Sequence, residues 1–101
     1  DFLRDLTVTT AFVSASGFTV DEGLSTSRTA IADTLKAAIY AAGTTVALVD
    51  SSKFRRGSLM AFAGPAELDL VITDDGLDRP AAEELRRAGI NLESATVGVD
   101  R

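Results

Sequence analysis

The segment Val46-Ala-Leu-Val49 constrains the fold of this chain more than any other feature. Four small or apolar residues in succession are typical of a β-strand that is buried on both faces, as in a parallel sheet. The polar run Asp50-Ser-Ser-Lys53 follows at once. Because ligands of open α/β sheets bind beyond the carboxyl ends of the strands, we expect this strand to present a lysine and hydroxyl groups to an anionic ligand. The alternative is a polar turn that only ends a core strand.

Strand-like and helix-like segments alternate along the chain. The clearest helix carries an apolar face made of Ile31, Leu35, Ala38, Ile39 and Ala42, at helical spacing. Strands are predicted over residues 7–13, 45–49, 68–73 and 91–97, helices over 27–42 and 78–88, one helical turn over 65–68, and the end of a helix over 1–5. Residues 58–62 fit either a short strand or a helical turn, and a loop is predicted over 17–23. This alternation predicts parallel βαβ units in a layered α/β sheet.

Residues typical of helix ends flank both predicted helices. A hydroxyl residue within 25–27 can cap the first helix, and Gly43 is expected to end it in the left-handed conformation. Asp78 or Arg79 precedes a proline at the start of the second helix, and Gly89 is expected to close it. The chain has neither a GxGxxG nor a GxxxxGK[ST] pattern, so no nucleotide or other cofactor is expected.

The two predicted helices are too few to cover both faces of a parallel sheet of four strands. Another part of the protein or a second copy of the chain is therefore expected to pack against the sheet. The chain begins at Asp1, without a methionine and close to a predicted strand, which suggests a piece cut from a longer protein. The predicted fold class is α/β, a Rossmann-like layered parallel sheet that is present as an incomplete fragment of one domain, over residues 1–101.

The composition excludes several classes of protein. A net charge of −5 argues against direct binding to nucleic acid, and the basic residues Lys36, Lys53, Arg55 and Arg56 are too few and scattered for a phosphate-binding face. The chain has no cysteine and no histidine, which removes the thiolate nucleophile, the usual general base and the commonest metal ligands. No membrane span and no signal peptide are visible, so a cytoplasmic protein is expected.

Two further groups of charged residues were weighed as sites. Asp69, Asp74, Asp75 and Asp78 could offer oxygen ligands to Mg²⁺ or Ca²⁺, but they lack the spacing of a calcium loop. A solvated acidic turn is the preferred interpretation, and no metal site is expected. Lys36 follows Leu35 at the border of the helix's apolar face, and it is either a solvent-facing lysine whose stem covers apolar surface or a second cation of the ligand site.

Five separated motifs carry a resemblance to a known family. They are Ala11-Phe12 with Gly17, Glu22-Gly23, Lys36 on its helix, Leu48 to Phe54, and Asp69 to Asp74. Together they resemble the C-terminal effector domain of DeoR-type bacterial transcriptional repressors. The run from Lys36 to Lys53 also resembles ribose-5-phosphate isomerases, to which that domain is related in fold. The resemblance implies a sugar-phosphate isomerase/CoA-transferase-like fold and covers nearly the whole chain.

Departures from these families favour sensing over catalysis. The isomerases carry acids in the loop after the first strand and directly before the helix lysine, where this chain has Ser14-Ala-Ser-Gly17 and Leu35. Isomerisation needs carboxylates that move protons, so the resemblance implies a sugar-phosphate pocket without its base. Thr10 and Ala32 stand where the repressors usually have acids, and either could alter the choice of ligand.

The resemblance implies an effector site that binds a phosphorylated sugar or a similar metabolite. Lys53 would be the main phosphate contact with Lys36 assisting, and Asp50 would accept bonds from sugar hydroxyls or hold Lys53. The complete set of expected effector-binding residues is Ser16, Gly17, Glu22, Gly23, Lys36, Asp50, Ser51, Ser52 and Lys53. The two glycines would let the backbone approach the ligand. Ligand binding would change the oligomer or domain arrangement and weaken operator binding by a winged helix that lies outside this chain.

Two alternatives stay open. The first is an active sugar-phosphate isomerase, whose base would have to be Glu22 or Asp50. The second is a domain that only forms homo-oligomers and whose pocket has decayed.

Overall fold

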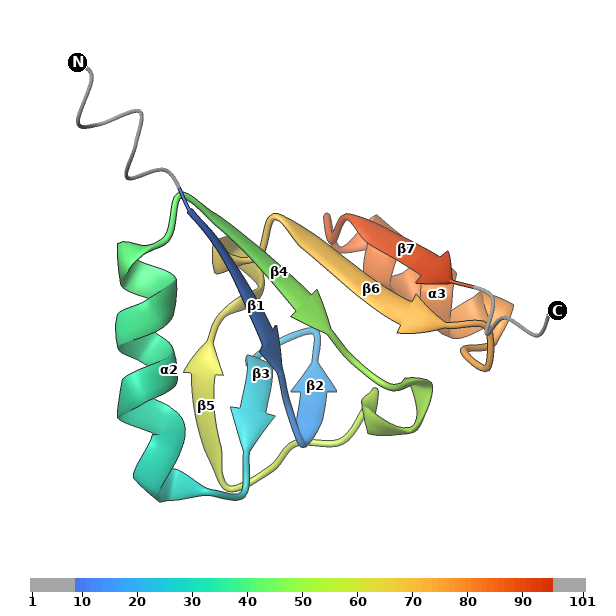
Figure 1. The fold of residues 1–101 in the computed structure, drawn as a ribbon. Coiled ribbons are helices and arrows are strands. Elements are labelled where there is room, and N and C mark those ends of the chain that lie inside the picture. Colours follow the sequence, from blue (N-terminus) through green and yellow to red (C-terminus); the bar gives the residue numbers. More distant parts are fainter. Residues whose placement is uncertain (1–8, 96–101) are drawn as a thin grey trace, which may run out of the picture.

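Four parallel strands form the central sheet in a computed structural model that describes residues 9–95. The order of the strands is β1-β4-β6-β7 (Figure 1). Their bounds are Thr10–Ser14 for β1, Thr44–Leu48 for β4, Leu70–Asp74 for β6 and Leu92–Ala95 for β7. The chain therefore has the predicted α/β fold with a parallel sheet. The expected helix end over 1–5 lies outside the described residues, as do the outer ends of the first and last predicted strands.

A second sheet of three antiparallel strands packs beside the first, and the sequence did not predict it. It has the order β2-β3-β5, with β2 at Gly17–Thr19, β3 at Gly23–Thr26 and β5 at Met60–Ala63. The loop predicted over 17–23 is thus wrong, because both of its ends belong to strands. The ambiguous segment 58–62 contributes to β5. Figure 1 shows this second sheet behind β1 and β4.

Two glycines allow the second sheet to form. A Cβ atom on Gly17 would lie 2.2 Å from the carbonyl oxygen of Arg56, and one on Gly23 would lie 2.0 Å from that of Ala63. Gly23 also has φ +80°, where other residues are strained. Their missing side chains therefore admit neighbouring backbone, a role that was not predicted; the approach of a ligand to these glycines stays a prediction.

The two helices lie close to their predicted positions. Helix α2 spans Thr29–Ala41 and α3 spans Arg79–Arg87; single 3-10 turns, η1 at Ser51–Lys53 and η2 at Pro65–Glu67, follow β4 and β5. Asp78 caps α3 by accepting a hydrogen bond from the Ala81 N–H at 2.8 Å, as predicted. Gly89 follows with φ +93°.

Two predictions about the ends of α2 are wrong. No side chain within 25–27 caps the helix. Its N-cap position is Arg28, which has no side-chain cap bond, because residues 24–26 pair with β5 instead. Gly43 is not left-handed. Helix α2 ends at Ala42 in extended conformation, and the Gly43 N–H donates to the Thr9 carbonyl at 2.8 Å.

The layer that covers the central sheet lies on one face only. The strand order runs in one direction, so three right-handed crossovers all fall on the same side. On that side the register aligns one buried residue from each strand, namely Val13, Ala47, Val71 and Leu92. These residues join a core with Phe18, Leu24 and other apolar side chains of the second sheet and the helices.

The opposite face of the central sheet, here called the outer face, stays uncovered within residues 9–95. It carries the aligned row Phe12, Val46 and Leu70, and beside it Leu48 and Ile72. Phe12 is 65% exposed and Leu48 is 44% exposed. This observation agrees with the prediction that the chain's own helices do not cover both faces. No helix in the described part of the chain is long and apolar enough to cross a membrane.

Candidate functional site

The turn after β4 is built by its own side chains. The Asp50 carboxylate accepts a hydrogen bond from the Ser52 N–H at 3.0 Å and another from the Ser52 hydroxyl. The Lys53 N–H donates to the Asp50 carbonyl at 2.9 Å and closes the 3-10 turn. An aspartate that directly follows a strand thus caps the turn it begins. Within residues 9–95 Asp50 makes no bond to the Lys53 side chain, so it does not hold that side chain; its expected contact to sugar hydroxyls stays a prediction.

Asp74, the last residue of β6, ties this turn to the neighbouring strand. Its carboxylate accepts hydrogen bonds from the Ser51 N–H at 2.9 Å and from the Gly76 N–H at 2.8 Å. The bond from the Ser51 backbone contributes most, and together these bonds lower the pKa of Asp74 to about 2. The sequence predicts a solvated acidic turn at Asp74, so its bond to the neighbouring turn is a finding of the structure. The Asp-x-Gly spacing of Asp74 and Gly76 is the local signal that could have indicated it.

A shallow hollow lies at the carboxyl edge between these two strand ends. It has a volume of about 290 Å³, and its lining residues are Leu48, Val49, Asp50, Ile72, Thr73, Asp74 and Ala95. Among the buried polar side-chain atoms of residues 9–95, the Thr73 hydroxyl is the one left without a hydrogen-bond partner. The hollow is thus placed where an open α/β sheet binds ligands.

Lys53 sits at the rim of this edge rather than in the lining of the hollow. Its side chain is half-buried, and within residues 9–95 its ammonium group makes no hydrogen bond or ion pair. The next residue, Phe54, anchors the turn in the core, where its ring packs edge-on against Phe18 at 5.3 Å between centroids. The Arg55 N–H donates to the Phe18 carbonyl at 2.8 Å and continues the attachment to β2. The turn that carries the lysine is therefore anchored in the core, and within residues 9–95 no acidic side chain pairs with the lysine's charge.

The other expected site residues belong to other elements than this turn. Ser16 and the two glycines belong to the second sheet or its approach, where the Ser16 N–H donates to the Ser25 carbonyl at 2.9 Å. Glu22 is exposed in the turn between β2 and β3. Lys36 is exposed on α2, which packs against β5, at the opposite edge of the second sheet from β2 (Figure 1). Lys36 and Lys53 are therefore not brought together within one chain.

Three of the four acidic residues of the possible metal site accept hydrogen bonds from backbone N–H groups instead. Asp69 lies at the amino end of β6, where it accepts a bond from the Thr45 N–H at 2.7 Å, while Asp78 caps α3. Over residues 9–95 no three acidic, histidine or cysteine side chains are arranged to hold a metal ion.

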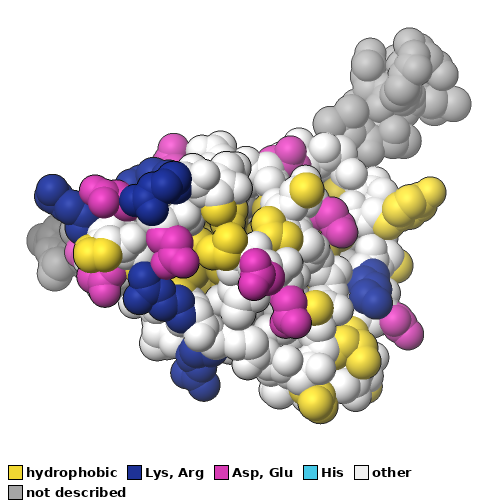
Figure 2. All heavy atoms as spheres, turned by 180° about the vertical axis from the view of Figure 1, so that it is seen from behind, with side chains coloured by type: hydrophobic (Ala, Val, Ile, Leu, Met, Phe, Trp, Pro, Cys, Tyr) yellow, Lys and Arg dark blue, Asp and Glu magenta, His cyan; other side chains and the backbone are white. Residues whose placement is uncertain are grey.

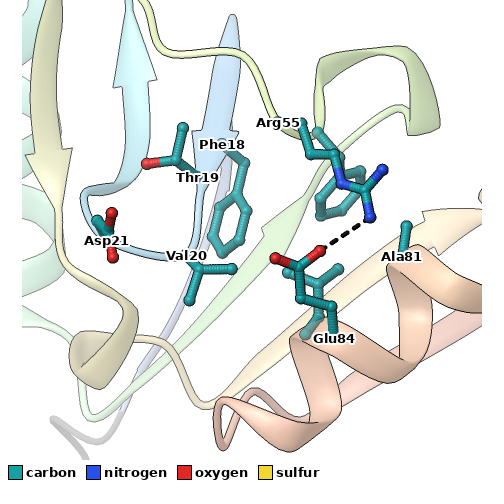
Figure 3. A pocket seen from close by; sticks show the side chains of 9 residues that line it. Phe18, Thr19, Val20, Asp21, Arg55, Ala81 and Glu84 are labelled. Atoms are coloured by element: carbon teal, nitrogen blue, oxygen red, sulfur yellow. Dashed lines mark hydrogen bonds and ion pairs between the residues drawn. The ribbon is translucent and has the colours of Figure 1, made fainter.

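A second hollow, here called the crevice, lies between β2 and α3 and was not predicted. Its volume is about 310 Å³, and it is lined by Phe18, Thr19, Val20, Asp21, Phe54, Arg55, Ala81, Glu84 and Leu85. The Arg55 guanidinium and the Glu84 carboxylate form an ion pair across it at 2.8 Å (Figure 3). The bond to Glu84 and its charge raise the pKa of Arg55. The two residues are 29 positions apart, so no local pattern in the sequence could show their pairing.

Comparisons with known proteins agree with the resemblance. The family model of the DeoR C terminal sensor domain matches residues 1–75. A protein named HTH-type transcriptional regulator GlpR, from Haloferax volcanii, is 33% identical over 81 residues, which is 80% of this chain and 32% of that protein. A putative aga operon transcriptional repressor from Escherichia coli O157:H7 is 36% identical over 47 residues, or 46% of this chain and 18% of that protein. The matches thus span a third or less of the length of these curated relatives.

Proposed function

The chain belongs to the DeoR C terminal sensor domain family, and on that premise we propose that it senses a phosphorylated sugar or a similar anionic metabolite for a transcriptional repressor. The observation that carries this proposal is Lys53, a half-buried lysine without a partner in the described structure, at the carboxyl edge of a parallel sheet. A phosphate would supply the missing counter-charge, which lysine binds as a point charge.

The rest of the turn positions the lysine. The backbone N–H groups of Ser51 and Ser52 donate hydrogen bonds to the carboxylates of Asp74 and Asp50. These bonds fix the shape of the turn before a ligand binds. Around Lys53, the turn also carries the hydroxyls of Ser51 and Ser52, of which that of Ser52 donates to Asp50. Such preorganisation reduces the entropy that binding must overcome. Lys36 lies too far around the fold to share this phosphate within one chain.

The site is suited to binding without conversion. An isomerase needs a carboxylate that takes up a proton near neutral pH. Asp74 has a pKa of about 2, and both Asp74 and Asp50 already accept backbone hydrogen bonds. The end of β1 and the loop after it offer Ser14 and Ser16 instead of acids. We therefore assign the chain a regulatory and non-enzymatic role, in which ligand binding changes how the full-length repressor is arranged on its operator.

The apolar outer face supports a further part of the proposal. Parallel sheets are normally covered on both sides, so we expect this face to pack against a second copy or against another part of a longer regulator. DNA would be bound by such another part, since this chain carries net charge −5.

A thermal-shift screen of the full-length protein against ribose 5-phosphate, glucose 6-phosphate, fructose 1-phosphate and fructose 6-phosphate tests the proposal. A ligand at about 100 times its Kd adds about 2.7 kcal/mol to the free energy of unfolding. Lys53→Ala should weaken binding by about tenfold or more, because a charge-assisted contact is lost. Lys36→Ala is the matched control and should leave the Kd unchanged.

Three results would contradict the proposal. They are the absence of a shift with every sugar phosphate, an unchanged Kd in the Lys53→Ala protein, and turnover of any compound in the panel. The last result would favour the isomerase alternative, and the first would favour a domain that only oligomerises.

A further inference from the structure

The crevice between β2 and α3 has rigid walls. Phe18 is fully buried and Phe54 is 8% exposed, and from α3 the buried residues Ala81 and Leu85 face them. All of these side chains except Ala81 belong to the hydrophobic core, so the crevice cannot close without repacking that core. Its volume of about 310 Å³ lies at the lower end of the range for small-molecule sites.

Arg55 reaches across the crevice from a backbone in the left-handed conformation. Within residues 9–95, Arg55 is the one residue other than glycine with a positive φ, at +64°. Such a conformation persists only where surrounding contacts enforce it. The enforcing contacts are the hydrogen bond from the Arg55 N–H to Phe18 and the β-bridge between Phe18 and Arg56. As a result the guanidinium reaches α3 and meets Glu84 (Figure 3).

The polar groups of the crevice favour an uncharged ligand. Arg55 brings one positive charge, while Glu84 and Asp21 bring two negative charges, so a phosphate group would meet a net negative lining. Guanidinium N–H groups donate and carboxylate oxygens accept, which together match hydroxyl groups that do both. Arg55 and Glu84 keep 61% and 49% of their side chains exposed, so both can turn toward a ligand. Viewed from behind, Figure 2 shows apolar side chains at the centre of this face, bordered by acidic and basic ones.

We propose that the crevice is a second ligand site, which binds an uncharged polyhydroxylated molecule of monosaccharide size between Arg55, Glu84 and Asp21. The C–H groups of the ligand contact Val20 and Leu85, and its hydroxyls bond to the charged groups in place of part of the Arg55–Glu84 pair. This site needs no contribution from Lys53 and takes a different chemical class from the phosphate-bearing ligand proposed for the carboxyl edge.

Amide chemical shifts of the ¹⁵N-labelled chain test the proposal. The probes are D-glucose, D-galactose, D-fructose and myo-inositol, each added up to about 50 mM, which saturates a millimolar site. At least one probe should shift the amides of residues 19–21 and 81–85. Glu84→Gln should weaken this binding about tenfold, since it removes a charged hydrogen-bond acceptor. Glu83→Gln, on the same helix but outside the crevice lining, should leave the Kd unchanged.

A second variant tests the crevice without changing its charge. Val20→Trp fills the space and should abolish the shifts while the remaining spectrum stays that of a folded chain. Lys53→Ala should leave sugar binding in the crevice intact, which separates this site from the carboxyl edge. The proposal is overturned if no probe shifts these amides, or if Glu84→Gln and Val20→Trp bind a probe as tightly as the unaltered chain.

Discussion

The two faces of the central sheet carry similar amounts of apolar side chain but have opposite surroundings. On the covered face the row from Val13 to Leu92 is at most 5% exposed, because the second sheet and both helices pack over it. On the outer face Phe12 is 65% exposed, although its neighbour in the register, Val46, is 7% exposed. Val46 is shielded by adjacent side chains and does not belong to the core cluster. Burial of a residue and membership of the core are therefore separate properties in this fold.

This difference indicates where the fold is stabilised and where it is available for assembly. The covered face supplies the hydrophobic burial that holds the single chain together. The outer face contributes little to the stability of a single chain. Its apolar side chains would stabilise the protein only when further protein covers them. Three pairs of substitutions test this division, in order of the expected effect.

The largest contrast is expected between two phenylalanines. Phe18→Ala should lower the free energy of unfolding by about 3–5 kcal/mol, because Phe18 is fully buried in the core. Phe12→Ala should change it by less than about 1 kcal/mol, because most of that ring is already in water. Urea unfolding followed by circular dichroism measures both values. Equal losses for the two variants would show that the outer face is covered in the folded chain.

A smaller loss of stability is expected at Gly23, where the backbones of β3 and β5 pack closely in the covering layer. Gly23→Ala should cost more than about 2 kcal/mol, since its Cβ would meet the Ala63 carbonyl and its φ is positive. Gly89→Ala is the matched control, because it shares the positive φ but has open space around it, and about 1–2 kcal/mol is expected there. Similar losses in thermal unfolding at the two positions would mean that β3 and β5 can move apart without cost.

The smallest change in stability is expected at Asp74, at the carboxyl edge of the central sheet. The pKa of Asp74 is lowered from 3.8 to about 2 in the folded chain, so its contribution to stability is complete above about pH 4 and is lost as the pH falls toward 2. Asp74→Asn should remove this dependence, and unfolding of the variant should involve about one proton fewer over that range. Urea unfolding between pH 2 and 5 gives the slope, with Asp75→Asn as the control. An unchanged slope would exclude Asp74 as the tie between the turn and β6.

Local patterns predicted the central sheet because each of its strands and helices is encoded over neighbouring residues. The apolar run at Val46–Val49, the stripe on α2 and the Asp78 cap are all of this kind. The second sheet escaped prediction because β2 has three residues, β3 begins at a glycine, and the pairing of β3 with β5 joins segments about 35 positions apart. Strand propensity is weak in such short segments and depends on the partners.

The candidate site divides in the same way. The position of Lys53 beyond a strand could be predicted from its sequence neighbours. The bond between Ser51 and Asp74 and the pair of Arg55 and Glu84 could not, because they join residues 23 and 29 positions apart. The separation of Lys36 from Lys53 has the same origin, since the unpredicted sheet lies between their elements.

The second sheet draws its strands from two different crossovers, β2 and β3 from the one before β4, and β5 from the one after it. The first βαβ unit is consequently not an independent module. On the ribosome, β3 has an unpaired edge until residues 60–63 have been made, and the core over Val13 and Ala47 closes only then. If the gene were cut between these crossovers, one piece would therefore carry β2 and β3 without β5, and the other would carry β5 without β2 and β3.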